Sequence, residues 1–109
     1  MSEPHEIDDA APVPAKIRFA IAHKRLLGFE YTGRLRIGEP HDFGAMNGTS
    51  KLLVYQRLVD GAADGGQGWR LLDVGKIGVC KVLQETFPGS RGDSHQAHMR
   101  WDAVFARVE

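Results

Sequence analysis

The sequence predicts a mainly β protein, built as a small SH3- or Sm-like barrel or as a rolled antiparallel sheet of five to six strands with one N-terminal helix. Two observations favour this fold class. A stretch of strong helix formers near the N-terminus gives way to short segments in which apolar and polar residues alternate. These segments recur about every ten residues and are separated by glycine, proline and asparagine. Closing the sheet would also remove exposed edge strands, which a small chain should avoid.

The N-terminal part of the chain divides into a tail and a helix. Residues 1–14 carry four acidic residues and no lysine or arginine, and then become rich in alanine and proline, so we expect a disordered tail. Residues 15–109 are expected to form one domain, because 109 residues leave room for a single core. A helix is predicted from Ala15 to about Leu26. Lys24 and Arg25 would lie in its last turn, where cations suit the helix dipole.

Turn signals and a period of two predict the strands. The pairs Thr32-Gly33 and Asn47-Gly48 are typical of tight turns. At Glu39-Pro40 the chain should be extended, because the residue before a proline avoids the helical region. The predicted strands are 27–32, 34–37, 51–59, 69–74, 79–86 and 101–108, with loops at 44–49, 60–68 and 90–100.

Composition and charge exclude several classes of protein. Residues 16–109 hold all 14 basic residues and 10 of the 14 acidic ones, a net charge of +4. Such a body can attract anions but is too weakly basic to require a nucleic-acid partner. No apolar run reaches the ~20 residues of a membrane span, and the N-terminus lacks the pattern of a secretory signal. The single cysteine, Cys80, fits a reducing compartment, so we expect a cytoplasmic protein without a membrane partner.

A series of short segments follows a recognisable order along the chain. The segments are Ala20-Ile21, then Phe29-Glu30-Tyr31-Thr32-Gly33 with Arg34 and Arg36, Glu39-Pro40-His41, Leu52-Leu53-Val54-Tyr55, residues 70–77 and Phe87. Over residues 16–87 the chain resembles the WYL domain, a small Sm- or SH3-like barrel preceded by a helix. The ordered series carries this resemblance, and no single segment is diagnostic.

The resemblance implies ligand sensing in transcription control or phage defence, with nucleotides or single-stranded nucleic acid as ligands. The chain departs from the family in two respects. Where the family has its Trp-Tyr-Leu triplet, this chain has Ser50-Lys51-Leu52, so a ligand contact built on the two aromatic rings is missing. Family members usually follow a DNA-binding helix-turn-helix, whereas only one helix is predicted here. We therefore expect a stand-alone version that does not read a promoter by that route.

Arginines, tyrosines and one histidine form the candidate binding surface. Arginines at alternate positions share one face of a predicted strand, and guanidinium groups suit phosphates because they donate two parallel hydrogen bonds. Tyrosine rings could add stacking on a base. In the other interpretation, the arginines lie on a solvated face and pair with Glu30, Glu39 and Asp73. The candidate ligand-binding residues are Tyr31, Arg34, Arg36, His41, Tyr55 and Arg70.

Other polar residues leave alternatives open. His41, placed at the rim of the site, could donate to a ligand anion, titrate as a switch, or cap the following loop. Gln56 has a half-buried amide that must be satisfied, so it either pins the neighbouring loop or faces a ligand. Cys80, His95 and His98 could converge on zinc, but nothing in their spacing requires it, and we predict no metal site.

No arrangement of residues predicts an enzyme. Ser50 and Ser94 lack the context of a nucleophile elbow, and the glycines of 61–68 do not precede a helix. Arg91-Gly92-Asp93 is interpreted as a turn. We predict a non-enzymatic ligand-sensing or regulatory domain that needs no cofactor and binds a phosphate-bearing ligand, such as a nucleotide or a short single-stranded nucleic acid. The alternative is a small interaction module that forms homo-oligomers or docks onto a regulator protein, with no small-molecule ligand.

Overall fold

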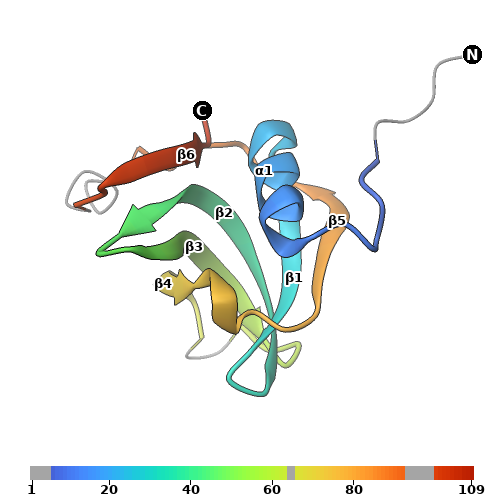
Figure 1. Ribbon diagram of the computed structural model, residues 1–109. Helices are drawn as coiled ribbons and strands as arrows, with labels where there is room; N and C mark the ends of the chain where they lie inside the picture. The colour runs from blue at the N-terminus through green and yellow to red at the C-terminus, as the bar shows by residue number, and fades with distance from the viewer. Residues whose placement is uncertain (1–5, 64–65, 93–99) are drawn as a thin grey trace, which may run out of the picture.

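The computed structural model describes residues 6–63, 66–92 and 100–109 (Figure 1). Within these residues, one sheet has the strand order β4-β3-β2-β1-β5, and β6 pairs with β2 off this path. This confirms the predicted mainly β fold class, in the form of an open antiparallel sheet. The elements are α1 (Val13–His23), β1 (Arg25–Tyr31), β2 (Arg34–Met46), β3 (Thr49–Val59), β4 (Gly68–Asp73), the 3-10 turn η1 (Val74–Lys76), β5 (Cys80–Thr86) and β6 (Ala103–Arg107).

Helix α1 packs against β1, β2, β5 and β6. It ends at His23 because Lys24 adopts the left-handed conformation, with φ 52° and ψ 46°, and its backbone N–H closes on the carbonyls of the preceding turn. The predicted extension of the helix to Leu26 is therefore wrong, and Arg25 already begins β1. Among the described residues, no helix is both long and apolar enough to cross a membrane.

Strand β2 is the centre of the sheet and is longer than predicted. One of its edges pairs with β3. Its other edge pairs with β1 over residues 34–38 and with β6 over residues 42–45. Pro40 lies between these two partners, so its missing N–H costs no ladder hydrogen bond on that edge. The loop predicted at 44–49 is instead the end of the β2–β3 hairpin, and only Asn47 and Gly48 leave the strands.

The two predicted turns are confirmed by their backbone geometry. Thr32 and Gly33 have φ values of 52° and 77°, and Asn47 and Gly48 have the same two values. Positive φ at both central residues is what the type I′ hairpin turn requires, and this turn matches the twist of the strands it joins. These turns fix the β1–β2 and β2–β3 hairpins.

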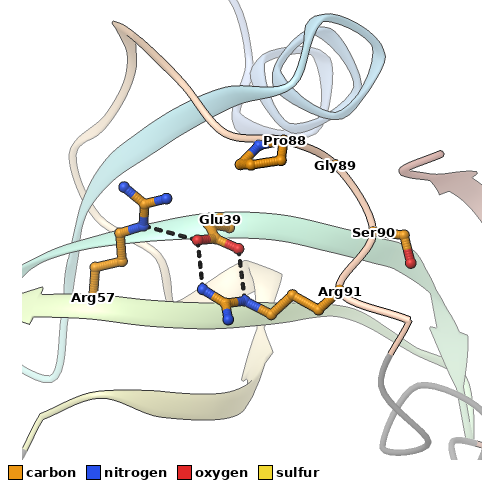
Figure 2. Close-up of a pocket in the computed structure, with 6 residues that line it drawn as sticks. All are labelled: Glu39, Arg57, Pro88, Gly89, Ser90 and Arg91. Atoms are coloured by element: carbon orange, nitrogen blue, oxygen red, sulfur yellow. Dashed lines mark hydrogen bonds and ion pairs between the residues drawn. The ribbon is translucent and has the colours of Figure 1, made fainter.

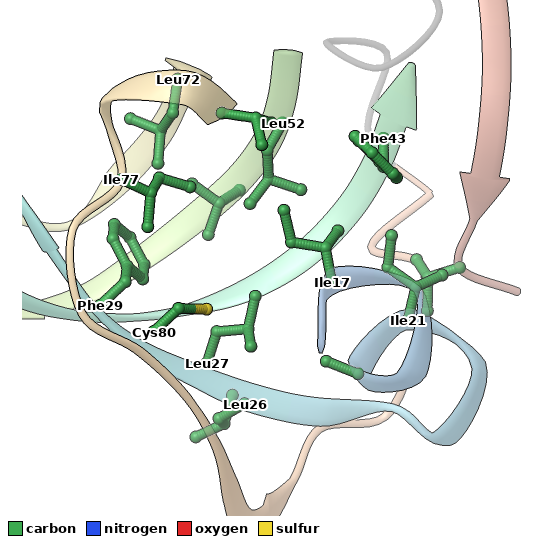
Figure 3. Packing of buried hydrophobic residues seen from close by; sticks show 14 of the residues in the cluster. Ile17, Ile21, Leu26, Leu27, Phe29, Phe43, Leu52, Leu72, Ile77 and Cys80 are labelled. Atoms are coloured by element: carbon green, nitrogen blue, oxygen red, sulfur yellow. The ribbon is translucent and has the colours of Figure 1, made fainter. Parts of the chain in front are cut away.

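The hydrophobic core lies between α1 and the sheet (Figure 3). Ile17 of α1, Leu27 of β1 and Leu52 of β3 are fully buried in it. Cys80 belongs to the same cluster. Burial raises the pKa of the Cys80 thiol to about 11, so this group is a neutral core side chain at physiological pH.

Candidate functional site

The structure brings three of the candidate ligand-binding residues to one pocket. Arg34, Arg36 and Arg70 line an open pocket of about 390 Å³, which we call the arginine pocket. Tyr31 lies beside it, with its ring centroid 5.7 Å from the guanidinium carbon of Arg36. The other two candidates, the histidine and the second tyrosine, lie elsewhere. The remaining lining residues of the pocket are Gln56, Val59, Ala62 and Gly66.

Strand pairing explains why these arginines meet. Arg36 of β2 pairs with Phe29 of β1, which belongs to the core, and Arg70 of β4 pairs with the core residue Val54 of β3. Paired residues point to the same face of a sheet. The arginines therefore share the face that carries the core, whereas Leu35 points to the other face and is 63% exposed.

Arg36 is held by neutral acceptors. Its Nη1 donates to Oε1 of Gln56 at 2.9 Å, and its Nη2 donates to the hydroxyl oxygen of Thr32 at 2.7 Å. Its Nε donates to the carbonyl oxygen of Tyr31 at 3.2 Å. In the described part of the chain, Arg36 forms no ion pair with a carboxylate. Its positive charge is therefore fixed in position without being neutralised by these contacts.

Gln56 and Arg70 converge on one backbone carbonyl. The buried amide of Gln56 accepts from Arg36 and donates through Nε2 to the carbonyl oxygen of Gly66. Arg70 donates to the same oxygen through Nη2 at 3.4 Å and to the carbonyl oxygen of Trp69 through Nη1 at 2.9 Å. Of the two roles left open for Gln56, pinning the neighbouring loop is confirmed, and Gln56 also lines the arginine pocket. Arg70, like Arg36, has no carboxylate partner among the described residues.

Two of the three acidic residues considered for this surface pair elsewhere. Glu39 and Asp73 bind basic side chains outside the arginine pocket. Arg34 lies 4.0 Å from Asp60, and their side chains are 63% and 57% exposed. An ion pair this open to water is weak. Three guanidinium groups thus share the pocket, and the described residues provide one weak carboxylate contact to them.

A second polar cluster surrounds the buried carboxylate of Glu39 (Figure 2). Arg57 donates to Oε2 through Nε at 2.8 Å. Arg91 donates to Oε1 through Nε and to Oε2 through Nη2, both at 2.9 Å. Nε2 of His41 lies 3.2 Å from Oε1. We call these four residues the Glu39 cluster.

Tyr55 lies at the Glu39 cluster and outside the arginine pocket. It pairs with Glu39 on β2 and with Trp69 on β4, which places all three side chains on the face opposite the core. The rings of Tyr55 and Trp69 meet edge to face, 5.4 Å apart. The guanidinium carbon of Arg91 sits 3.6 Å from the Tyr55 ring centroid. The prediction that Tyr55 shares a surface with the arginines of β2 is therefore wrong.

His41 is fully buried, so the prediction that it lies at the rim of the site is wrong. The register between β2 and β3 shifts by one residue between Pro40 and Asp42, which makes His41 a β-bulge. Its side chain keeps the face of Glu39 and Trp69, and the alternation changes phase at the residues that follow. The ring of His41 packs 4.7 Å from Trp69 and 5.5 Å from Phe87, measured between ring centroids.

The charges in the Glu39 cluster follow from burial and hydrogen bonding. Burial alone would raise the pKa of Glu39, but hydrogen bonds from Arg91, His41 and Arg57 outweigh it and hold the pKa below its ordinary value. Burial lowers the pKa of His41, and its hydrogen bond to Glu39 opposes this effect without cancelling it. At neutral pH Glu39 is thus ionised and accepts the Nε2 hydrogen of a neutral His41. Nδ1 of His41 is buried and has no hydrogen-bond partner among the described residues.

No protein-family model, no curated protein and no solved structure matches this chain. The resemblance to the WYL domain therefore stays a prediction.

Sequence reasoning missed two members of the Glu39 cluster. Arg57 reaches Glu39 only through the register of β2 and β3, which includes a shift near this position. Arg91 lies 52 residues from Glu39 and was assigned to a simple turn. No local pattern connects residues so far apart, so the sequence offered no signal for this contact.

The chemistry that both sites support is anion recognition. Within the described residues, no three His, Cys, Asp or Glu side chains are grouped so that they could hold a metal ion. His95 and His98, considered for zinc together with Cys80, lie outside the described residues, as does Ser94. Guanidinium groups dominate both sites, and they bind anions through charge and paired N–H donors.

Proposed function

We propose that this protein is a ligand-binding regulatory domain that recognises a phosphate-bearing molecule in the arginine pocket. One observation carries the proposal: Arg36 and Arg70 face one pocket and direct their hydrogen bonds within the described residues to neutral acceptors. Such groups keep their charge and present N–H donors that fit phosphate oxygens. A pocket of about 390 Å³ has room for a phosphate and part of the molecule that carries it.

The charge of the pocket favours phosphate over weaker anions. Its lining contributes three guanidinium groups. The nearby carboxylate of Asp60 is exposed and lies 4.0 Å from Arg34, so it neutralises little of this charge. A phosphate monoester carries a charge of about −1.5 to −2 at neutral pH and three acceptor oxygens. Nucleotides and short single-stranded nucleic acids are our candidates, in line with the resemblance to the WYL domain. Tyr31 offers an aromatic ring next to Arg36.

The double substitution R34A/R70A should abolish stabilisation by the ligand and leave the fold intact. Neither guanidinium group binds a buried carboxylate within the described residues, so their loss leaves no buried charge unpaired. For the wild-type protein, a ligand at about 100 times its Kd should raise the free energy of unfolding by about 2.7 kcal/mol. Thermal unfolding with inorganic phosphate, mononucleotides, cyclic dinucleotides and short oligonucleotides measures this effect.

The matched control is R18A, which removes an exposed arginine of α1 outside the pocket. This variant should keep the full ligand-induced increase in Tm. Undiminished stabilisation of R34A/R70A would contradict the proposal. Absence of any stabilisation of the wild-type protein by this series would contradict it as well.

Self-association is the second candidate function, and an exposed apolar patch favours it. Leu35 and Val79 are 63% and 69% exposed. Together with Ile37 and Leu83 they border a shallow hollow of about 260 Å³. Large exposed apolar side chains that gather in one place are typical of interaction surfaces. A second copy of the chain would cover the patch with the same apolar residues.

If the patch joins two copies, sedimentation velocity should show a monomer–dimer equilibrium that depends on protein concentration. Replacing Leu35 by lysine places a charge in the contact and should shift this equilibrium to the monomer. A wild-type protein that remains monomeric at the highest accessible concentration would exclude this candidate. Ligand-induced stabilisation of such a monomer would leave the arginine pocket as the functional site.

A further inference from the structure

A second pocket, of about 370 Å³, lies at the Glu39 cluster, between the β2–β3 pair and the segment that follows β5 (Figure 2). It combines one buried carboxylate, two partly exposed guanidinium groups and a proline ring. No residue lines both this pocket and the arginine pocket. Its lining residues are Glu39, Arg57, Pro88, Gly89, Ser90 and Arg91.

Glu39 fixes the geometry of this pocket and has no acceptor capacity left. Its two oxygens make four contacts, one with Arg57, two with Arg91 and one with His41. A carboxylate offers about four lone-pair sites, so these contacts fill them. Any further N–H donor in the pocket must therefore find an acceptor other than Glu39.

Arg57 is the residue with such donors. It binds Glu39 through Nε alone, at 2.8 Å. Figure 2 shows its two terminal nitrogens pointing away from Glu39. Among the described residues, these two nitrogens have no hydrogen-bond partner. The side chain is 37% exposed, so a small molecule can reach them from solvent.

We propose that the terminal nitrogens of Arg57 bind a carboxylate group that enters this second pocket. Two N–H donors in one plane match the two coplanar oxygens of a carboxylate. The ring of Pro88 offers an apolar contact for the carbon skeleton. This site is separate from the phosphate site proposed above and does not depend on it.

The carboxylate can belong to a small molecule or to the C-terminus of a peptide, and both present the same two oxygens. Benzoate and its uncharged analogue benzamide are the probes for the shared chemistry. A peptide with a free C-terminus, compared with the same peptide amidated, tests the second source. In a titration of the protein with benzoate, the NMR signal of the Arg57 Nε–H should shift until the site is saturated. Benzamide should cause no such shift.

The deciding variant is R57K, which keeps a positive charge near Glu39 but loses the planar pair of donors. Its affinity for benzoate should be about tenfold weaker, the size expected for one lost charge-assisted hydrogen bond. R70A should retain the wild-type affinity for benzoate, because Arg70 lines the other pocket.

Equal shifts by benzoate and benzamide, or an unchanged benzoate affinity of R57K, overturn the proposal. Preference for the free peptide over the amidated one supports a peptide source, and binding of benzoate alone supports a small molecule. Should R57K fail to fold, the wild-type comparison of benzoate with benzamide decides the question alone. Loss of phosphate binding by R34A/R70A with retained benzoate binding separates this site from the arginine pocket.

Discussion

Replacing Glu39 by glutamine should destabilise the folded protein by about 3–5 kcal/mol, the cost of breaking a buried ion pair by removing one partner. Glu39 is 1% exposed, and its carboxylate contacts two guanidinium groups and His41. The amide of glutamine keeps the shape but loses the charge. It also turns an NH₂ donor toward groups that are themselves donors. Urea denaturation followed by circular dichroism measures the loss, with an unchanged m-value.

The matched control is E85Q, the same change at an exposed position of β5. A substitution on the surface away from special features usually stays within about 0.5 kcal/mol of the wild-type stability. Similar losses in E39Q and E85Q would show that the Glu39 cluster does not hold the fold together.

The Glu39 cluster also predicts how stability depends on pH. The folded pKa of Glu39 is below its ordinary value of 4.5, so its contribution is present above pH 4.5 and is lost as the pH falls through the folded pKa. The folded pKa of His41 is below its ordinary value of 6.5, so the unfolded chain binds this proton first. Acidification therefore lowers the free energy of unfolding through both groups, and the effect of His41 begins at a higher pH than that of Glu39. Urea midpoints of the wild-type protein should fall below pH 6.5, and E39Q should lack the part of the loss that belongs to Glu39.

Leu52→Ala should destabilise the protein by about 2–5 kcal/mol, because truncation removes buried methyl groups and leaves a cavity that the core fills only in part. Leu52 of β3 is fully buried. The matched control is Leu35→Ala on the neighbouring strand, where the side chain is 63% exposed and the change should be close to zero. Urea denaturation of both variants compares the same chemical change on the two faces of one sheet. Equal losses would contradict the placement of the core.

Much of the fold follows from short-range signals in the sequence. The pairs Thr32-Gly33 and Asn47-Gly48 fix two hairpins because their residues adopt positive φ, and both turns are found where they were predicted. The end of α1 could not be found in this way. Left-handed caps are usually glycine or asparagine, and here the cap is Lys24, which gives no such signal.

The candidate sites were predictable only in part. The spacing of Arg34 and Arg36 places both on one strand face, and this alternation survives in the structure. Beyond the bulge at His41, the alternation of β2 changes phase, so a period of two places Asp42 and the residues after it on the wrong faces. The contact of Arg91 with Glu39 spans 52 residues and depends on the completed sheet. Long-range register, and not residue type, decided which polar groups meet.

One edge of β2 pairs with two different strands, so it carries two separate hydrogen-bond ladders. Strand β6 bonds to residues 42–45, β1 bonds to residues 34–38, and Pro40 interrupts the ladder between them. Release of β6 would leave the ladder between β2 and β1 intact, but it would break the ion pair of Arg107 with the buried Asp42 and remove Val108 from the core. The vacated edge would accept a matching strand from a second molecule or an added peptide.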